Sequence, residues 1–233
     1  MPSTIQTVDD LRGPAGRLEA ILNVGRTDAA YAAVVCHPHP PSGGTMHTKT
    51  VYQAMKAFSY FGLPVLRFNF RSVGASEGVY DDGPGEIADV RAAIDWLDRT
   101  YQLPILLAGF SFGANIGLRA ACGDARVKGL VGLGLPVEAG RKIYTYEFLQ
   151  ACTAPKLFLT GALDPFAPRA TMERVFADAP EPKQMKWIDN AEHFFAGVPG
   201  SPMTKLPQMQ QAMRQWLHEN FFPLQPAVAA TER

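Results

Sequence analysis

Hydrophobic positions alternate between two spacings from residue 31 onward. Short, almost continuously apolar runs are typical of strands that are covered on both faces. They predict strands over residues 31–36, 64–70, 104–110, 127–133, 156–160 and 184–188. Between these runs, apolar side chains recur every three or four residues, which predicts amphipathic helices. In the clearest helix, residues 86–101, this spacing places Val90 and Ile94 on the buried stripe and Asp89 on the solvent side.

Strands that alternate with helices predict an α/β fold, in which a mostly parallel sheet carries helices on both faces. The first thirty residues have weaker strand patterns at 3–8 and 16–22, which favour an antiparallel hairpin at the sheet edge. No break in composition divides the chain, so residues 1–222 are predicted to form a single domain. Residues 223–233 show no periodicity and are predicted to be disordered.

Composition narrows the possible partners. The 22 Lys and Arg balance 22 Asp and Glu, whereas nucleic-acid binders and membrane-surface proteins usually carry a basic excess. The N-terminus shows no signal-peptide pattern, and the three cysteines (Cys36, Cys122, Cys152) lie beside apolar or small residues. We therefore expect a cytoplasmic protein with buried free thiols that binds a small molecule rather than nucleic acid or membrane.

The sharpest motif is Gly-Phe-Ser-Phe-Gly at residues 109–113, between an apolar strand and a helical run. A G-x-S-x-G sequence at such a junction is the nucleophile elbow, whose tight turn lifts the serine hydroxyl above the sheet. Ser111 is therefore the candidate nucleophile, although a glycine-rich turn without chemistry can carry the same letters.

A serine nucleophile requires a base, and the base requires an orienting carboxylate. In sheets that carry this elbow, the triad follows the chain order serine, acid, histidine. Only His193 and His218 follow Ser111. His218 lies on the polar face of a predicted helix, whereas His193 follows a strand at the edge where Ser111 is expected. His193 is the candidate base.

Asp164 is the candidate acid because it follows the strand 156–160, again at a carboxyl end. An Asp-Pro pair is also typical of an exposed turn without further function. The competing carboxylates are Asp178, Asp189 and Glu192; Asp189 and Glu192 lie too close to His193 in sequence to be favoured.

Stabilising an oxyanion requires two N–H donors. The backbone N–H of Phe112 follows the nucleophile and is the first candidate. The second should lie in the loop after the first parallel strand, where prolines at 38, 40 and 41 cannot donate. His39 is thus the second candidate, and His37 is interpreted as structural. A metal site on these two histidines lacks further ligands nearby, so no metal or cofactor is expected.

The chain resembles the α/β-hydrolase superfamily, and within it small lidless bacterial serine hydrolases related to dienelactone hydrolases. The matching segments are residues 37–51, 66–78, 109–113, 161–168 and 191–195. The resemblance implies an eight-stranded sheet, a triad of Ser111, Asp164 and His193, and ester hydrolysis without a cofactor. Two departures stand out: dienelactone hydrolases use a cysteine nucleophile, and Ser72 replaces a glycine that is usual in its loop.

We therefore expect a carboxylesterase that acts through an acyl-enzyme on Ser111, as a monomer or homodimer. Residues 134–155 leave room for one helix, 146–151, and no cap domain, which favours small or short-acyl esters. Aromatic side chains could wall the site or belong to the core: Phe110, Phe112, Phe166, Phe194 and Phe195. A thioesterase would use the same triad, and a non-catalytic ligand-binding protein could share the fold.

Overall fold

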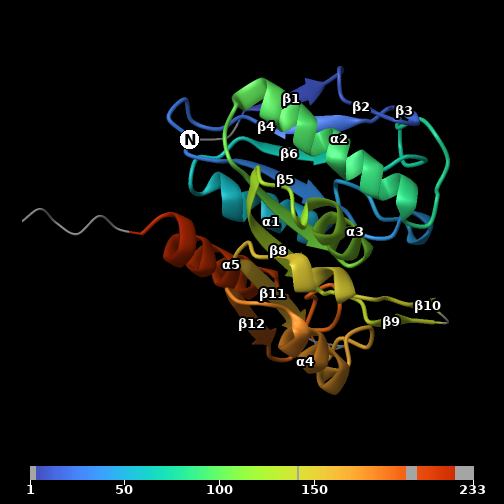
Figure 1. The fold of residues 1–233 in the computed structure, drawn as a ribbon, viewed down its shortest axis with the longest axis vertical. Helices are drawn as coiled ribbons and strands as arrows, with labels where there is room; N and C mark the ends of the chain where they lie inside the picture. Colours follow the sequence, from blue (N-terminus) through green and yellow to red (C-terminus); the bar gives the residue numbers. More distant parts are fainter. Residues whose placement is uncertain (1–3, 141, 198–203, 224–233) are drawn as a thin grey trace, which may run out of the picture.

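The computed structural model describes residues 4–140, 142–197 and 204–223 and contains one eight-stranded, mostly parallel sheet (Figure 1). Its order is β1-β4-β6-β5-β7-β8-β11-β12. The strands from β6 to β12 run parallel, and β1 and β4 add antiparallel pairs at one edge. Their bounds are β1 Ile5–Val8, β4 Ala20–Asn23, β5 Ala32–Cys36, β6 Val65–Phe68, β7 Ile105–Phe110, β8 Val127–Leu133, β11 Lys156–Gly161 and β12 Lys183–Ile188. The α/β fold expected from the sequence is confirmed.

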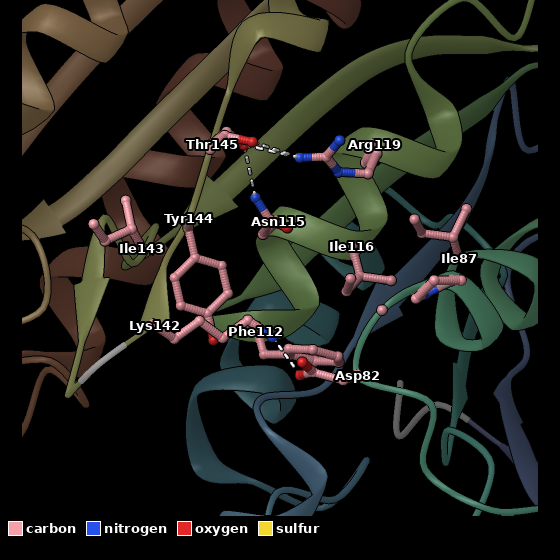
Figure 2. Close-up of a pocket in the computed structure, with 12 residues that line it drawn as sticks. Asp82, Ile87, Phe112, Asn115, Ile116, Arg119, Lys142, Ile143, Tyr144 and Thr145 are labelled. Carbon is pink, nitrogen blue, oxygen red and sulfur yellow. Dashed lines mark hydrogen bonds and ion pairs between the residues drawn. The ribbon is translucent and has the colours of Figure 1, made fainter.

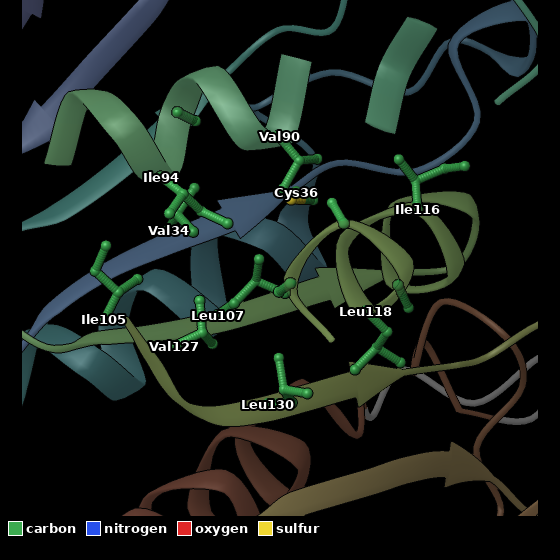
Figure 3. Packing of buried hydrophobic residues seen from close by; sticks show 14 of the residues in the cluster. Val34, Cys36, Val90, Ile94, Ile105, Leu107, Ile116, Leu118, Val127 and Leu130 are labelled. Carbon is green, nitrogen blue, oxygen red and sulfur yellow. The ribbon is translucent and has the colours of Figure 1, made fainter. Parts of the chain in front are cut away.

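Helices cover both faces of the sheet. The helices α1 (Lys49–Ser59) and α5 (Leu206–Phe221) pack on one face, and α2 (Pro84–Tyr101), α3 (Phe112–Ala121) and α4 (Arg169–Asp178) pack on the other. Alternate side chains of β5 belong to different cores, which explains why this strand is apolar throughout. Figure 3 shows the core under α2 and α3, where Val34 and Leu107 of the sheet meet Ile94 and Leu118 of the helices.

The register brings the ends of five parallel strands to one edge of the sheet. Cys36 of β5 pairs with Gly109 of β7. The next residue of β7, Phe110, pairs with Leu133, the last residue of β8. Gly161 pairs with Ile188 in the same way, so β11 and β12 end together. The loops after β5, β7, β11 and β12 therefore open on the same side, and these loops carry the candidate site residues.

Two segments differ from the sequence prediction. The strand expected over 16–22 is divided: β3 (Gly16–Arg17) pairs with β2 (Arg12–Gly13), and β4 begins only at Ala20. Between them, the side chain of Leu18 is completely buried. The expected helix 146–151 is instead a 3₁₀ helix, η2 (Glu147–Ala151), and a short hairpin of β9 (Glu138–Ala139) and β10 (Lys142–Ile143) precedes it.

Asp89 was expected to face water, and this prediction is wrong. Its side chain is completely buried, and its carboxylate accepts hydrogen bonds from Arg71 Nε at 3.0 Å and Arg71 Nη2 at 2.8 Å. The pair anchors the loop after β6. In that loop Ser72 adopts φ 69°, the left-handed region that glycine prefers, which accounts for the glycine usual at this position.

Other expectations meet the structure only in part. Cys36 and Cys152 are buried free thiols, whereas Cys122 is only half-buried. Within the described part of the chain, no helix combines the length and apolar character that crossing a membrane requires. Of the tail predicted from Pro223, residues 224–233 lie outside the described residues, as does residue 3, the first of the strand predicted over 3–8.

Candidate active site

Ser111 lies on a tight turn between β7 and α3. Its backbone has φ 55° and ψ −123°, a strained conformation for a residue with a side chain. The flanking glycines are required by space: a Cβ on Gly109 would lie 2.2 Å from the carbonyl oxygen of Gly113, and a Cβ on Gly113 would lie 2.2 Å from that of His37. This geometry is that of a nucleophile elbow.

His193 links the serine to a carboxylate. Its Nε2 lies 2.8 Å from Ser111 Oγ, and its Nδ1 lies 2.8 Å from Asp164 Oδ2. The other oxygen of Asp164 accepts the backbone N–H of Phe166 at 2.9 Å. His193 is 4% exposed and Asp164 is 5% exposed, so little water competes for these bonds. With Asp164 ionised, Nδ1 is the donor, and Nε2 is free to accept the serine proton.

Aromatic rings fix the position of the His193 imidazole. The ring centroids of Phe166, Phe110 and Phe194 lie 4.7, 5.0 and 5.3 Å from that of His193. On another side, a Cβ on Gly134 would lie 3.3 Å from Nδ1, and this glycine adopts φ 51°. The packing leaves the imidazole little freedom to rotate away from Ser111.

The competing residues do not join this arrangement. His218 lines a separate hollow on the α1–α5 side with Tyr60 and Arg214. Asp189 is exposed beyond the end of β12, and Glu192 accepts the backbone N–H of Ala196 at 2.7 Å. Asp178 ends α4.

The two candidate oxyanion donors come from different segments, the start of α3 and the loop after β5. Phe112 is the first residue of α3, where backbone N–H groups have no partner inside the helix. His39 precedes the 3₁₀ turn η1 (Pro40–Ser42), and its carbonyl accepts the N–H of Gly44 at 3.1 Å. Among the described residues, no group accepts the N–H of either Phe112 or His39. Both donors remain available for a ligand.

His37 acts as a bridge between loops. Its Nδ1 donates to the carbonyl of Pro38 at 2.7 Å, and its Nε2 accepts the N–H of Phe70 at 2.9 Å. The ring nitrogens of His39 are engaged as well, with Ser42 Oγ and Tyr80 OH. All four ring nitrogens of the two histidines are therefore engaged in hydrogen bonds, which leaves none free to bind a metal in the alternative reading. Within the described ranges, no cluster of three or more His, Cys, Asp or Glu is arranged to hold an ion.

Burial of His37 makes the stability of the fold depend on pH. Burial lowers the pKa of His37 to about 4, because the charged form would be desolvated. An unfolded histidine titrates near pH 6.5, so the stability gained from a neutral His37 is complete above that pH and is lost as the pH falls toward 4. In this window, the free energy of unfolding falls by about 1.4 kcal/mol for each unit that the pH decreases.

We expect the free energy of unfolding to fall by about 2 kcal/mol between pH 6.5 and 5 through this group. Urea unfolding at several pH values measures the slope. His37→Gln should be less stable at pH 7 but should show a shallower slope, since the titrating group is gone. Equal slopes in the two proteins would assign the pH dependence to other residues.

A pocket of about 430 Å³ opens over Ser111 and His193. Of the aromatic residues considered for its wall, Phe166 and Phe194 line it, Phe110 packs behind His193, and Phe112 and Phe195 are completely buried. The remaining lining residues are Pro38, His39, Ser42, Gly43, Gly44, Thr48, Pro136, Ala139, Lys142 and Tyr144.

Lys142 and Tyr144 are wall residues that sequence reasoning missed. They come from the β9–β10 hairpin region, whose two-residue strands are too short to produce a periodic pattern. The same two side chains also line an adjoining hollow of about 280 Å³ between α3 and the loop before α2. Figure 2 shows that hollow, with Asn115 and Arg119 of α3 donating hydrogen bonds to Thr145. The hairpin thus separates the two spaces.

Comparison with known proteins shows the family of this chain. A family model described as an alpha/beta hydrolase domain matches residues 32–219. An uncharacterized protein of Rickettsia prowazekii (strain Madrid E) is 35% identical over 190 residues, covering 78% of this chain and 79% of that protein.

Solved structures give the same assignment. An alpha-beta serine hydrolase homologue from Coxiella burnetii is 31% identical with a TM-score of 0.78, covering 93% of this chain and 98% of that chain. A serine hydrolase without lid from Xanthomonas campestris is 30% identical with a TM-score of 0.78, covering 97% and 98%. With a family match over most of its length and an elbow serine hydrogen-bonded to histidine, this chain belongs to the α/β-hydrolase family.

Proposed function

We propose that this protein is a serine esterase that cleaves carboxylic esters through an acyl-enzyme on Ser111. The observation that carries the proposal is the chain of two 2.8 Å contacts from Ser111 Oγ through His193 to Asp164. The strained elbow and the two available N–H groups beside it support the same chemistry.

The proposal assigns a role to each of these residues. His193 Nε2 accepts the Ser111 proton as Oγ attacks the ester carbonyl, and the N–H groups of Phe112 and His39 stabilise the oxyanion. His193 then donates that proton to the leaving alcohol. Water then transfers a proton to the same nitrogen as it attacks the acyl-enzyme, and His193 returns that proton to Ser111 Oγ as the acyl–oxygen bond breaks and the acid is released. Asp164 holds Nδ1 protonated and stabilises the imidazolium that forms in each step.

The shape of the site supports small or short-acyl esters. The pocket of about 430 Å³ is at the low end for ligand sites, and the 3₁₀ helix η2 and the β9–β10 hairpin do not amount to a cap domain. A thioester would be attacked by the same residues. Rates on oxygen esters and thioesters with the same acyl group decide which leaving atom the site prefers.

A fluorophosphonate probe tests the proposal directly, because it reacts with a serine whose proton is removed by a neighbouring base. We expect stoichiometric labelling of the wild type on the peptide that carries Ser111. Ser111→Ala should lose the label and also hydrolysis of p-nitrophenyl acetate, by about 10³-fold or more.

Ser72→Ala is the matched control, since Ser72 lies on an exposed loop outside the site. It should label like the wild type. Labelling that persists in Ser111→Ala would assign the nucleophile to another residue. An unlabelled, inactive wild type would favour the ligand-binding alternative instead.

A further inference from the structure

The His39 side chain lies outside the proposed triad but contacts Ser42, Tyr80 and Phe112. Its Nδ1 lies 2.9 Å from Ser42 Oγ, and its Nε2 lies 2.9 Å from Tyr80 OH. The imidazole also packs edge-on against the ring of Phe112, with centroids 5.4 Å apart. His39, which carries one proposed oxyanion donor, is thus in direct contact with Phe112, which carries the other.

The hydrogen bonds of Tyr80 define the direction of this network. Its hydroxyl donates to Asp82 Oδ1 at 2.8 Å. A hydroxyl has a single proton, so Tyr80 must accept from His39 Nε2–H, and the neutral His39 must then accept from Ser42 at Nδ1. Burial, followed by the charge of Lys142, lowers the pKa of His39, and the charges of Asp82 and Glu86 oppose this only in part, so the neutral ring is favoured.

The outer end of the network is held by an ion pair. Lys142 of β10 donates to the same Oδ1 of Asp82 that accepts from Tyr80. Figure 2 draws this pair beside Phe112. Hydrogen bonds from Lys142 and Tyr80 lower the pKa of Asp82, so that it stays ionised and remains an acceptor. Asp82 therefore gives Tyr80 a fixed orientation.

The loop that carries His39 has few other ties to the rest of the molecule. Near His39 its backbone hydrogen bonds are internal: Ser42 and Gly44 donate to His39, and Gly43 donates to Pro40. Farther along the loop, the Met46 N–H donates to Asn69 Oδ1 at 2.8 Å and the Met46 carbonyl accepts from Arg67 Nη1 at 3.1 Å. His37 anchors the start of the loop to Phe70. Between these two anchors, His37 and Met46, the hydrogen bond from His39 to Tyr80 ties residues 38–45 to the rest of the described chain. A small displacement of a donor weakens oxyanion stabilisation, because the effect depends on donors fixed in advance.

We infer that Tyr80 and Asp82 are positioning residues that hold the His39 backbone N–H in place through the His39 imidazole. This role rests on the proposed function, since it concerns the oxyanion of the same reaction. Neither residue touches the reacting atoms. Their contribution should therefore appear in the rate of the chemical step rather than in substrate binding.

Tyr80→Phe tests the inference, because it keeps the ring against His39 and removes only the hydroxyl. On p-nitrophenyl acetate we expect kcat to fall about 5- to 20-fold while KM changes less than about twofold, which is part of the loss expected for a missing donor. Asp82→Asn, which retains a carbonyl acceptor for Tyr80, should cause a smaller loss. Tyr101→Phe, on a half-buried tyrosine at the end of α2, is the control and should leave kcat unchanged.

A double-mutant cycle separates positioning from a general structural effect. His39→Phe keeps the aromatic contact with Phe112 and removes both ring nitrogens. In that background, Tyr80→Phe should change kcat less than twofold, because the two residues act through one bond. The inference would be overturned if the fold-losses in kcat of the two single variants multiplied in the double variant. It would also be overturned if Tyr80→Phe raised KM and left kcat unchanged.

Labelling by the fluorophosphonate on the same samples distinguishes the two levels of failure. If the wild type is labelled and Tyr80→Phe keeps the wild-type kcat, the positioning role alone is overturned. An unlabelled wild type overturns the proposed esterase function and the positioning role together.

Discussion

Replacing Asp164 with Asn should lower kcat for ester hydrolysis by about 10⁴-fold, with little change in KM. The substitution keeps the shape of the side chain. Its carbonyl oxygen can still accept the N–H of Phe166, which lies 2.9 Å from Oδ1. The amide nitrogen then faces His193 Nδ1, where Oδ2 lies 2.8 Å away in the wild type. Two donors cannot share that contact, so the imidazole must take the tautomer that carries its proton on Nε2 and cannot accept the proton of Ser111.

Steady-state kinetics on p-nitrophenyl acetate measure this effect, and thermal unfolding verifies that the variant is folded. Asp189→Asn is the matched control, because Asp189 is an exposed carboxylate close to His193 in sequence. It should stay within about twofold of the wild type, as expected for a solvated surface group. If Asp164→Asn retained wild-type kcat, Asp164 would not be the acid of the triad.

Gly113→Ala should lower the free energy of unfolding by at least about 3 kcal/mol. The added Cβ would lie 2.2 Å from the carbonyl oxygen of His37 and 2.7 Å from that of Cys36. Both are backbone atoms at the end of a central strand, so neither can swing aside as a flexible side chain would. Relief requires α3 and β5 to separate, which would also displace the His39 N–H from Ser111. Variant molecules that fold should therefore be poorly active.

Gly123→Ala separates this steric effect from the conformational cost of replacing glycine. Gly123 has open space around its Cβ position but adopts φ 84°, whereas Gly113 has no such left-handed backbone. The control should lose only about 1 kcal/mol, from the left-handed conformation. Urea unfolding of the two variants gives the comparison. If Gly113→Ala were no less stable than Gly123→Ala, the backbone at the end of β5 would have to move at little energetic cost to make room for the added methyl group.

The sequence predicted the sheet well because each central strand buries both of its faces. That burial requires a nearly continuous apolar run, and such a run is visible without knowledge of its neighbours. The helices that cover the sheet were visible for a similar reason, since a single buried stripe repeats with the helical period. Where elements are too short for a period, as in β2, β3, β9 and β10, the prediction failed.

The candidate triad could be predicted because parallel strands end at a common edge. Ser111, Asp164 and His193 each follow a different strand, and the topology alone places the three loops together. Their roles stay predictions, but the structure brings their side chains into one hydrogen-bonded chain.

Side-chain partners across the fold could not be predicted in this way. Asp89 has the spacing of a solvent-facing residue, yet it is buried because Arg71, 18 residues earlier, needs a counter-charge where the loop after β6 meets α2. Lys142 and Asp82 are 60 residues apart, the first in the two-residue strand β10 and the second in the loop before α2. Nothing in the local pattern of either segment indicates the other.

By itself, the sequence determined the α/β class, the order of the central strands along the chain, and which residues stand at strand ends with the chemistry for acyl transfer. Only the tertiary structure decided that Ser111 lies within reach of His193, that His39 is tied to Tyr80 and Asp82, and that Lys142 and Tyr144 wall the pocket. The physical reason is that burial leaves a periodic signal along the chain. Hydrogen bonds and ion pairs between distant loops depend on distances that exist only after the chain has folded.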